Sequence, residues 1–125
     1  MTILFRLGSS AIAKKFVGWV FAHLSFLLPV KRLAESDQLI AFHHPSPSYP
    51  VHVLLVPKKA IPNLAELDAV DAGLLIEILQ TAQNLAHELG LSESGYRLVI
   101  NGGEYQKVPQ MHFHLIPASD DQPET

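Results

Sequence analysis

The segment Gln110–Ile116 constrains the fold most strongly, because polar and apolar residues alternate along it. An alternation with a period of two is typical of a β-strand that buries one of its faces. In such a strand the side chains of Gln110, His112 and His114 point to one side and apolar side chains to the other. The two imidazoles then lie about 7 Å apart, and imidazole has the side-chain pKa nearest to neutrality. The segment therefore predicts a core strand that carries a pair of reactive histidines.

A long helical pattern and three further strand patterns accompany this segment. Apolar residues recur at helical spacing from Leu64 to Leu89, and Asp68 and Asp71 favour a helix N-terminus nearby. Gly90 is expected to end the helix in a left-handed conformation. Strands are predicted at Gln38–His43, Val51–Val56 and Tyr96–Asn101. Strands interrupted by one long helix indicate an α+β fold with an antiparallel sheet. We expect the helix to cover one face of the sheet and the histidines to form a site on the other.

Composition and charge indicate one globular domain with a distinct N-terminal segment. Of the 125 residues, 48% are hydrophobic and 17% charged, which excludes a disordered chain, and the net charge of −3 argues against a nucleic-acid binder. The chain has no cysteine, which fits a reducing compartment and an expected cytoplasmic location. Residues 1–34 carry a charge of +5 and no acid, whereas residues 35–125 carry −8. We therefore divide the chain into a basic, apolar helical segment (1–34), a domain (35–118) and a polar tail (119–125).

The N-terminal segment predicts a helix over Ala11–Leu28, which Pro29 ends. Its apolar part, Phe16–Leu28, would be about 20 Å long, which is short of the roughly 30 Å hydrocarbon core of a bilayer. A transmembrane span is therefore not expected. Two roles remain open for the helix. It packs on the domain or on a partner subunit, or residues 11–32 contact an anionic membrane surface through Trp19 and the flanking bases.

The strand at 110–116 resembles the motif of the histidine-triad (HIT) family, His-φ-His-φ-His-φ-φ, in which φ is apolar. Gln110 stands at the first triad position, and His112 and His114 stand at the second and third. The resemblance extends over about residues 38–117, including the segment His52–Lys59 and the segment Gly95–Asn101. Within the family the chain looks most like the Hint-type nucleoside phosphoramidases and their relatives that cleave dinucleoside polyphosphates. The resemblance implies a HIT-like antiparallel sheet with one long helix, a homodimer, a nucleotide substrate, and no cofactor or metal.

The resemblance also implies a catalytic set around the motif strand. His112 would attack an α-phosphorus and form a nucleotidyl-imidazole intermediate that water then hydrolyses. The main-chain carbonyl of Gln110 would hold the other ring nitrogen of His112, and a carbonyl survives a change of side chain. His114 would donate to a phosphate oxygen or assist the leaving group, and His52 would support the triad.

A substrate-binding set follows from the same resemblance. It places the nucleobase against Phe42, Pro45 and Leu54, and the phosphate or the leaving group against Asn101, Gln106 and Lys107. His44 stands where the family usually has an acidic residue that binds the ribose hydroxyls. A carboxylate accepts two hydroxyl hydrogen bonds, whereas a neutral imidazole accepts one. We therefore expect weaker selection for a purine nucleoside.

Three hypotheses remain open for the histidines. The leading one is a nucleotide hydrolase or transferase that cleaves a phosphoramidate or phosphoanhydride through His112. The second is a non-catalytic nucleotide-binding module, with or without contact to a membrane surface, which Gln110 and His44 motivate. The third is a metal site built from His52, His112 and His114, since three imidazoles can bind zinc.

The basic N-terminal segment generates a test of membrane contact. We expect the intact protein to co-sediment with anionic vesicles at low salt, because aromatic insertion adds to an attraction of about 1 kcal/mol per base near an anionic surface. Added salt should weaken this binding by shortening the Debye length. A variant without residues 1–34 serves as the control. Intact protein that stays in the supernatant at low salt would instead identify the helix as a packing element.

Overall fold

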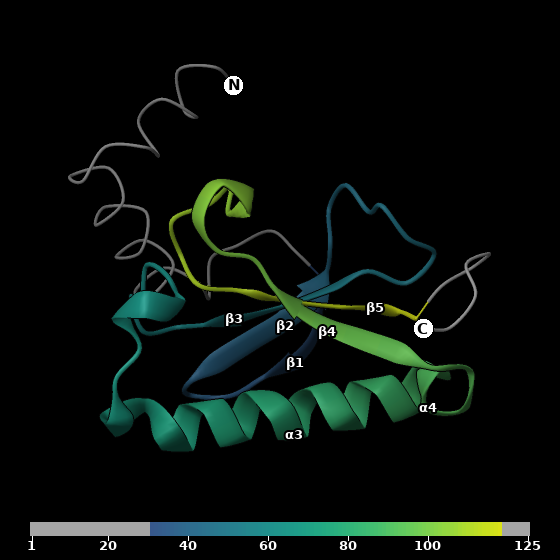
Figure 1. Ribbon diagram of the computed structural model, residues 1–125. Helices are drawn as coiled ribbons and strands as arrows, with labels where there is room; N and C mark the ends of the chain where they lie inside the picture. The colour runs from purple at the N-terminus through teal and green to yellow at the C-terminus, as the bar shows by residue number, and fades with distance from the viewer. Residues whose placement is uncertain (1–30, 119–125) are drawn as a thin grey trace.

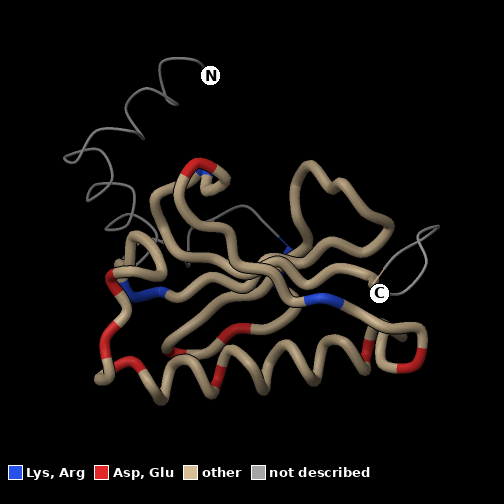
Figure 2. The backbone as a smooth tube through the Cα atoms, viewed as in Figure 1, with Lys and Arg blue, Asp and Glu red and all other residues tan. Residues whose placement is uncertain are grey.

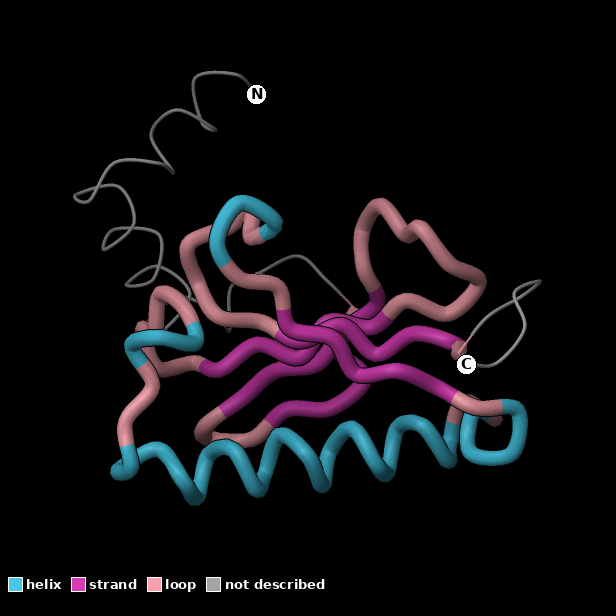
Figure 3. Tube along the Cα trace, in the orientation of Figure 1, coloured by secondary structure: helices cyan, strands magenta, loops and turns pink. Residues whose placement is uncertain are grey.

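The computed structural model describes residues 31–118, which form one five-stranded antiparallel sheet with a long helix on one face (Figures 1 and 3). The strands lie across the sheet in the order β1-β2-β3-β5-β4. Their bounds are β1 (Arg32–Glu35), β2 (Leu39–His43), β3 (Val53–Pro57), β4 (Tyr96–Ile100) and β5 (Phe113–Pro117). The predicted α+β class, with one long helix packed on an antiparallel sheet, is confirmed.

The alternation of side chains along the strands gives the sheet two different apolar faces. The face toward the helix α3 (Ala72–Glu88) forms the main core, to which the strands contribute Leu39, Ala41, Val53, Leu55, Phe113 and Leu115. On the other face, Ile40, Phe42 and Val56 form a smaller cluster with Leu54 packed against it. The register of β3 and β5 places Leu54 opposite His114. Leu54 and His114 therefore mark the face of the sheet that α3 does not cover.

The helix α3 packs on the sheet through side chains at helical spacing, namely Leu74, Ile78, Ala82, Leu85 and Ala86. Two short 3₁₀ turns precede it, η2 (Leu64–Glu66) and η3 (Ala69–Asp71). The Asp68 carboxylate accepts the Ala69 N–H at 2.6 Å, and the Asp71 carboxylate accepts the Asp68 N–H at 3.1 Å. This reciprocal capping box starts a new element at Asp68. The two aspartates thus lie near the N-terminus of α3, as predicted, whereas the helically spaced residues Leu64, Leu67 and Val70 precede the helix.

The strands β5 and β1 differ most from the predictions. β5 begins at Phe113 rather than at Gln110, because the N–H of Met111 donates to the carbonyl of Ile61 at 2.7 Å, outside the sheet ladder. β1 was not predicted. It is a four-residue edge strand whose register with β2 shifts between Arg32 and Ala34, and it is too short and irregular to give a clear alternation. β1 spans the position at residue 34 where the sequence suggested a boundary.

Several predictions fall on parts of the chain that the structure does not describe. The predicted helix Ala11–Leu28 and the tail 119–125 both lie outside the described residues. Within residues 31–118, no helix is long and apolar enough to cross a membrane.

Two glycines at opposite ends of α3 generate a paired prediction about stability. Gly90 has φ +75°, as predicted for the residue that ends this helix, whereas Gly73 is helical and exposed, with open space where a side-chain Cβ would lie. Gly90→Ala should lower the free energy of unfolding by about 1–2 kcal/mol, because alanine is strained in the left-handed region. Gly73→Ala should raise it by roughly 0.5–1 kcal/mol. Urea denaturation of both variants measures the sign of each change in the free energy of unfolding. Equal changes in the two variants would contradict the left-handed conformation of Gly90 and the helical conformation of Gly73.

Candidate active site

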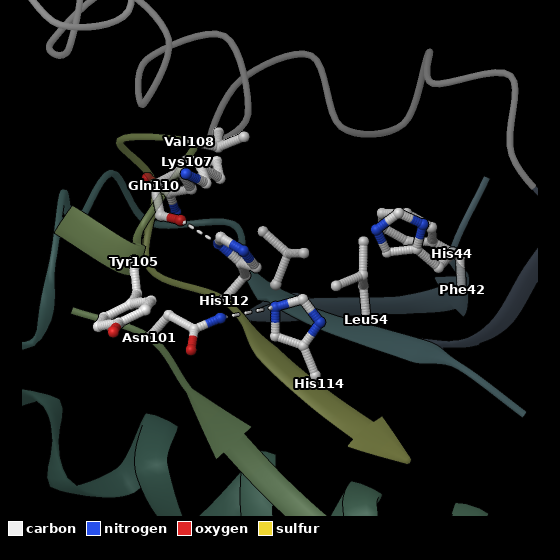
Figure 4. A pocket seen from close by; sticks show the side chains of 11 residues that line it. Phe42, His44, Leu54, Asn101, Tyr105, Lys107, Val108, Gln110, His112 and His114 are labelled. Atoms are coloured by element: carbon white, nitrogen blue, oxygen red, sulfur yellow. Dashed lines mark hydrogen bonds between the residues drawn. The ribbon is translucent and has the colours of Figure 1, made fainter. Parts of the chain in front are cut away.

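A pocket lies on the face of the sheet away from α3, where β5, β3 and the loop before β5 meet (Figure 4). Its lining residues are Phe42, His44, Leu54, Val56, Asn101, Tyr105, Lys107, Val108, Gln110, His112 and His114. None of them is acidic. Most acidic residues of the described chain lie along α3, the segment before it and the β1–β2 turn, with Glu104 an exception (Figure 2). The pocket therefore suits an anionic ligand.

The proton on His112 is positioned by the main chain. Nδ1 of His112 lies 2.7 Å from the carbonyl oxygen of Gln110. A carbonyl only accepts, so Nδ1 carries the hydrogen and Nε2 keeps its lone pair. Among the described residues, no hydrogen-bond partner lies against Nε2, and His112 lines the pocket. His112 is therefore prepared to act as a nucleophile.

His114 and His52 form a hydrogen-bond chain whose direction is fixed at its far end. The N–H of Ser48 donates to Nδ1 of His52 at 3.1 Å, so the hydrogen of His52 is on Nε2. Nε2 of His52 lies 2.8 Å from Nδ1 of His114 and donates to it. His114 must then carry its own hydrogen on Nε2, which points to the pocket. His52 is buried behind His114 and does not line the pocket itself.

Burial keeps these rings neutral. Burial, followed by the nearby His112, His52 and His44, lowers the pKa of His114 to about 4. Burial, followed by His44, also lowers the pKa of His52. The same chain of hydrogen bonds opposes protonation, because a second hydrogen on Nδ1 of His114 would face the N–H of His52. His114 is therefore a neutral hydrogen-bond donor at pH 7.

His44 adds another donor at the edge of the pocket. The N–H of Ser46 donates to Nδ1 of His44 at 2.9 Å, which leaves the hydrogen on Nε2. The ring stacks on His52 with 4.3 Å between centroids. Burial, followed by His112, lowers the pKa of His44. At neutral pH the ring therefore offers an N–H rather than a positive charge.

Asn101 and His114 together make a place for an oxygen atom. Nδ2 of Asn101 lies 3.5 Å from Nε2 of His114, at the outer limit of a hydrogen bond (Figure 4). Both nitrogens carry hydrogens in the tautomer derived above, so they bond poorly to each other. An anionic oxygen between them would accept from both. The exposed Lys107, which also lines the pocket, adds positive charge nearby.

The side chain of Gln110 does not lie as the sequence suggested. Gln110 and His112 precede β5, so the strand alternation does not govern them. Gln110 is 1% exposed, and its carboxamide bonds to the main chain of Pro57, Lys59 and Ile61. Its carbonyl faces His112, as the resemblance implied. A change of side chain at this position would keep the carbonyl but would remove these three buried bonds.

The remaining predicted site residues fall into two groups, those that line the pocket and those that do not. Phe42, His44, Leu54, Asn101 and Lys107 line the pocket. Two predicted residues, Gln106 and Pro45, are not among the lining residues. Gln106 donates to the carbonyls of Pro62 and Val108 and so holds the loop, and Pro45 is exposed.

Three lining residues were missed by the sequence analysis. Val56 follows Leu54 by two positions on β3, so strand alternation signalled that it shares the pocket face. Tyr105 and Val108 lie in the loop that includes the 3₁₀ turn η4 (Gly103–Tyr105). No periodicity in that loop marks them.

The geometry does not support the three-histidine metal site. Within residues 31–118, no group of three or more histidine, cysteine or acidic side chains is arranged to hold a metal ion. Nε2 of His52 and Nδ1 of His114 bond to each other, and Nδ1 of His112 bonds to Gln110. The lone pairs that a metal would need therefore do not converge.

Relatives in two cyanobacteria match most of the chain. An uncharacterized HIT-like protein of Synechococcus elongatus is 41% identical over 91 residues, which are 71% of this chain and 79% of that protein. An uncharacterized HIT-like protein of Synechocystis is 38% identical over the same number of residues, with the same shares of the two chains.

Solved structures match the fold as well. The HIT family hydrolase of Legionella pneumophila is 34% identical, with a TM-score of 0.75 over 82% of this chain and 93% of its own. The histidine triad nucleotide-binding protein of Candida albicans is 28% identical, with a TM-score of 0.70 over 81% of this chain and 74% of its own. The family model for the HIT domain matches residues 27–121, which is well over half of the sequence. The chain therefore belongs to the HIT domain family.

Proposed function

We propose that this protein is a nucleotide hydrolase or transferase that cleaves a phosphoramidate or phosphoanhydride bond at the α-phosphorus. The observation that carries the proposal is the Nε2 lone pair of His112, which meets no hydrogen-bond partner among residues 31–118 and is held toward the pocket by the 2.7 Å bond from Nδ1–H to the Gln110 carbonyl. A neutral imidazole in this tautomer is a competent nucleophile without any prior proton transfer.

The reaction proceeds in two balanced steps. In the first, the Nε2 lone pair of His112 forms a bond to phosphorus, and the bond from phosphorus to the leaving nitrogen or oxygen breaks. The electron pair goes to the leaving group, which takes a proton from solvent. The ring now carries a positive charge, which the Gln110 carbonyl stabilises through Nδ1–H. In the second step water attacks phosphorus, the P–N bond returns its pair to Nε2, and a proton goes to solvent.

The hydrogen-bond chain supports charge stabilisation as the role of His114. The resemblance left two roles open, donation to a phosphate oxygen or help to the leaving group. A neutral imidazole that gave up its only hydrogen would become an anion, and the burial that lowers the pKa of His114 disfavours either charged form of the ring. We therefore assign the Nε2–H of His114, with Asn101, to a non-bridging phosphate oxygen.

The pocket divides into an apolar part and a donor-rich part. Phe42, Leu54 and Val56 offer apolar surface for a nucleobase. Asn101, Lys107 and the histidines offer donors for phosphate. The names of similar proteins support this proposal: one is called a HIT family hydrolase and another a histidine triad nucleotide-binding protein. The Hint-type phosphoramidase activity, the homodimer and membrane contact through residues 11–32 remain parts of the proposal.

A non-catalytic nucleotide-binding module is the second candidate. The observation that favours it is Gln110, which leaves the first triad position without an imidazole. Both candidates predict nucleotide binding, so binding alone does not separate them. A covalent intermediate does, because only the enzyme forms a nucleotidyl-histidine.

His112→Asn should remove most hydrolytic activity while the fold stays intact. We expect kcat to fall by roughly 10³-fold or more, equivalent to about 4 kcal/mol in the activation barrier. The assay is a panel of adenosine and guanosine phosphoramidates and dinucleoside polyphosphates. His43→Asn is the matched control, because His43 is exposed on β2 and does not line the pocket. Wild-type protein quenched in alkaline denaturant, in which the P–N bond is stable, should retain a nucleotidyl group on His112.

Wild-type turnover in His112→Asn would disprove the nucleophile. Nucleotide binding by the wild type with no hydrolysis and no trapped intermediate would favour the non-catalytic module.

The lowered pKa of His114 predicts that the fold loses stability on acidification at pH values well above those at which carboxylates titrate. The unfolded chain binds a proton at His114 near pH 6.5 and the folded chain only near pH 4. Stability is therefore full above about pH 6.5 and is lost as pH falls from there toward 4. His52 and His44, whose pKa values are also lowered, act in the same direction. The urea midpoint of unfolding should decrease as the pH is lowered from 7.5 to 5.5, and it should decrease less in His114→Asn. A flat wild-type midpoint would contradict this.

A further inference from the structure

The carboxamide of Gln110 is one of the most completely buried polar groups in the described chain. Gln110 is 1% exposed. Its Nε2 donates to the carbonyl of Pro57 at 3.0 Å and to that of Lys59 at 2.8 Å, and its Oε1 accepts the N–H of Ile61 at 3.2 Å. One side chain thus satisfies three main-chain groups at the end of β3 and in the loop that follows it.

Few side chains can satisfy that arrangement. The loop presents two acceptors and one donor, and a carboxamide supplies two donors and an acceptor. A neutral imidazole supplies one of each, a carboxylate supplies no donor, and a thioether supplies neither in useful strength. A replacement at position 110 therefore leaves at least one buried main-chain group unpaired, which is more costly than losing an exposed bond.

The same residue controls the nucleophile through its main chain. His112 lies before β5, so no ladder bond of the sheet fixes its position. Its segment is instead held by two anchors on one loop, the Gln110 carboxamide and the bond from Met111 N–H to the Ile61 carbonyl at 2.7 Å. The Gln110 carbonyl between these anchors accepts the Nδ1–H of His112.

We propose that the Gln110 carboxamide is a positioning group that sets the tautomer of His112. By fixing Gln110 to the Pro57–Ile61 loop, it holds the carbonyl where Nδ1 must carry the hydrogen. When the carboxamide is lost, the carbonyl moves, and the hydrogen can occupy Nε2, where it blocks the lone pair. The importance of this tautomer for turnover rests on the proposed function, but the tautomer itself does not.

The test is Gln110→Met, which keeps a long unbranched side chain and removes the three bonds. Nitrogen-15 NMR of the histidine rings, without substrate, reports which nitrogen of His112 carries the hydrogen. We expect a single Nδ1–H form in the wild type and a mixture in Gln110→Met. With a hydrolysed substrate from the panel, kcat should fall by about 10²-fold, the size expected for a small misplacement of a reacting group, and KM should change little.

Two comparisons separate positioning from a general loss of stability. Leu85→Ala opens a cavity under α3, where Leu85 is 3% exposed and does not line the pocket. It should lower the urea midpoint of unfolding and keep the Nδ1–H tautomer. In Gln110→His, which restores one donor and one acceptor, the fraction of the Nδ1–H tautomer and kcat should both lie between those of the wild type and of Gln110→Met. Gln110→His replaces Gln110→Met if that variant does not fold.

An unchanged Nδ1–H tautomer in the folded Gln110 variants would overturn the proposal, whatever their rates. The same change of tautomer in Leu85→Ala would also overturn it, because the effect would then be a general consequence of destabilisation. If the wild type hydrolyses nothing on the panel, the proposed function fails, and the NMR comparison still decides the role of Gln110.

Discussion

The hydrogen bond from Nδ1–H of His112 to the carbonyl of Gln110 is the interaction on which the chemistry of this site depends. It determines which nitrogen of the ring is free, and it receives the positive charge that nucleophilic attack would create. A short series of hydrogen bonds connects this interaction to the core. The carboxamide of Gln110 is fixed to the loop that leaves β3, and β3 is the central strand of the sheet. A rigid scaffold thus supports a histidine that is itself outside any strand.

In the pair His52 and His114, the hydrogens are arranged in the opposite way to that in His112. Their hydrogen-bond chain starts at the main-chain N–H of Ser48, passes through His52 and ends at Nε2–H of His114. A main-chain amide does not release its hydrogen at neutral pH, so the chain orients hydrogens and does not transfer them. His112 offers a lone pair and His114 offers a hydrogen, although both are imidazoles in one pocket. The difference comes entirely from what the other nitrogen of each ring contacts.

Much of the fold could be predicted from the sequence because the burial pattern follows the secondary structure. The strand patterns located β2, β3 and β4 to within a few residues, and Gly90 ended α3 as expected. Asp68 and Asp71 marked the start of α3, whereas the helically spaced apolar residues Leu64, Leu67 and Val70 lie in the 3₁₀ segment before it. The motif led to most of the pocket. Tyr105 and Val108 were missed because they reach the pocket through the path of a loop, which leaves no periodic signal.

The buried carboxamide of Gln110 was the hardest feature to foresee, and it bears on whether a HIT protein can dispense with an imidazole at that position. The resemblance implies only that a glutamine stands where the motif has a histidine. The structure shows that the side chain at 110 bonds to the main chain of Pro57, Lys59 and Ile61, whereas the carbonyl of the same residue accepts the Nδ1–H of His112. In the proposed mechanism the groups that attack and stabilise phosphate come from other residues, namely His112, His114 and Asn101. A glutamine can therefore fill the first triad position without removing any group that contacts the phosphate, provided that the loop it binds presents two carbonyls and one N–H.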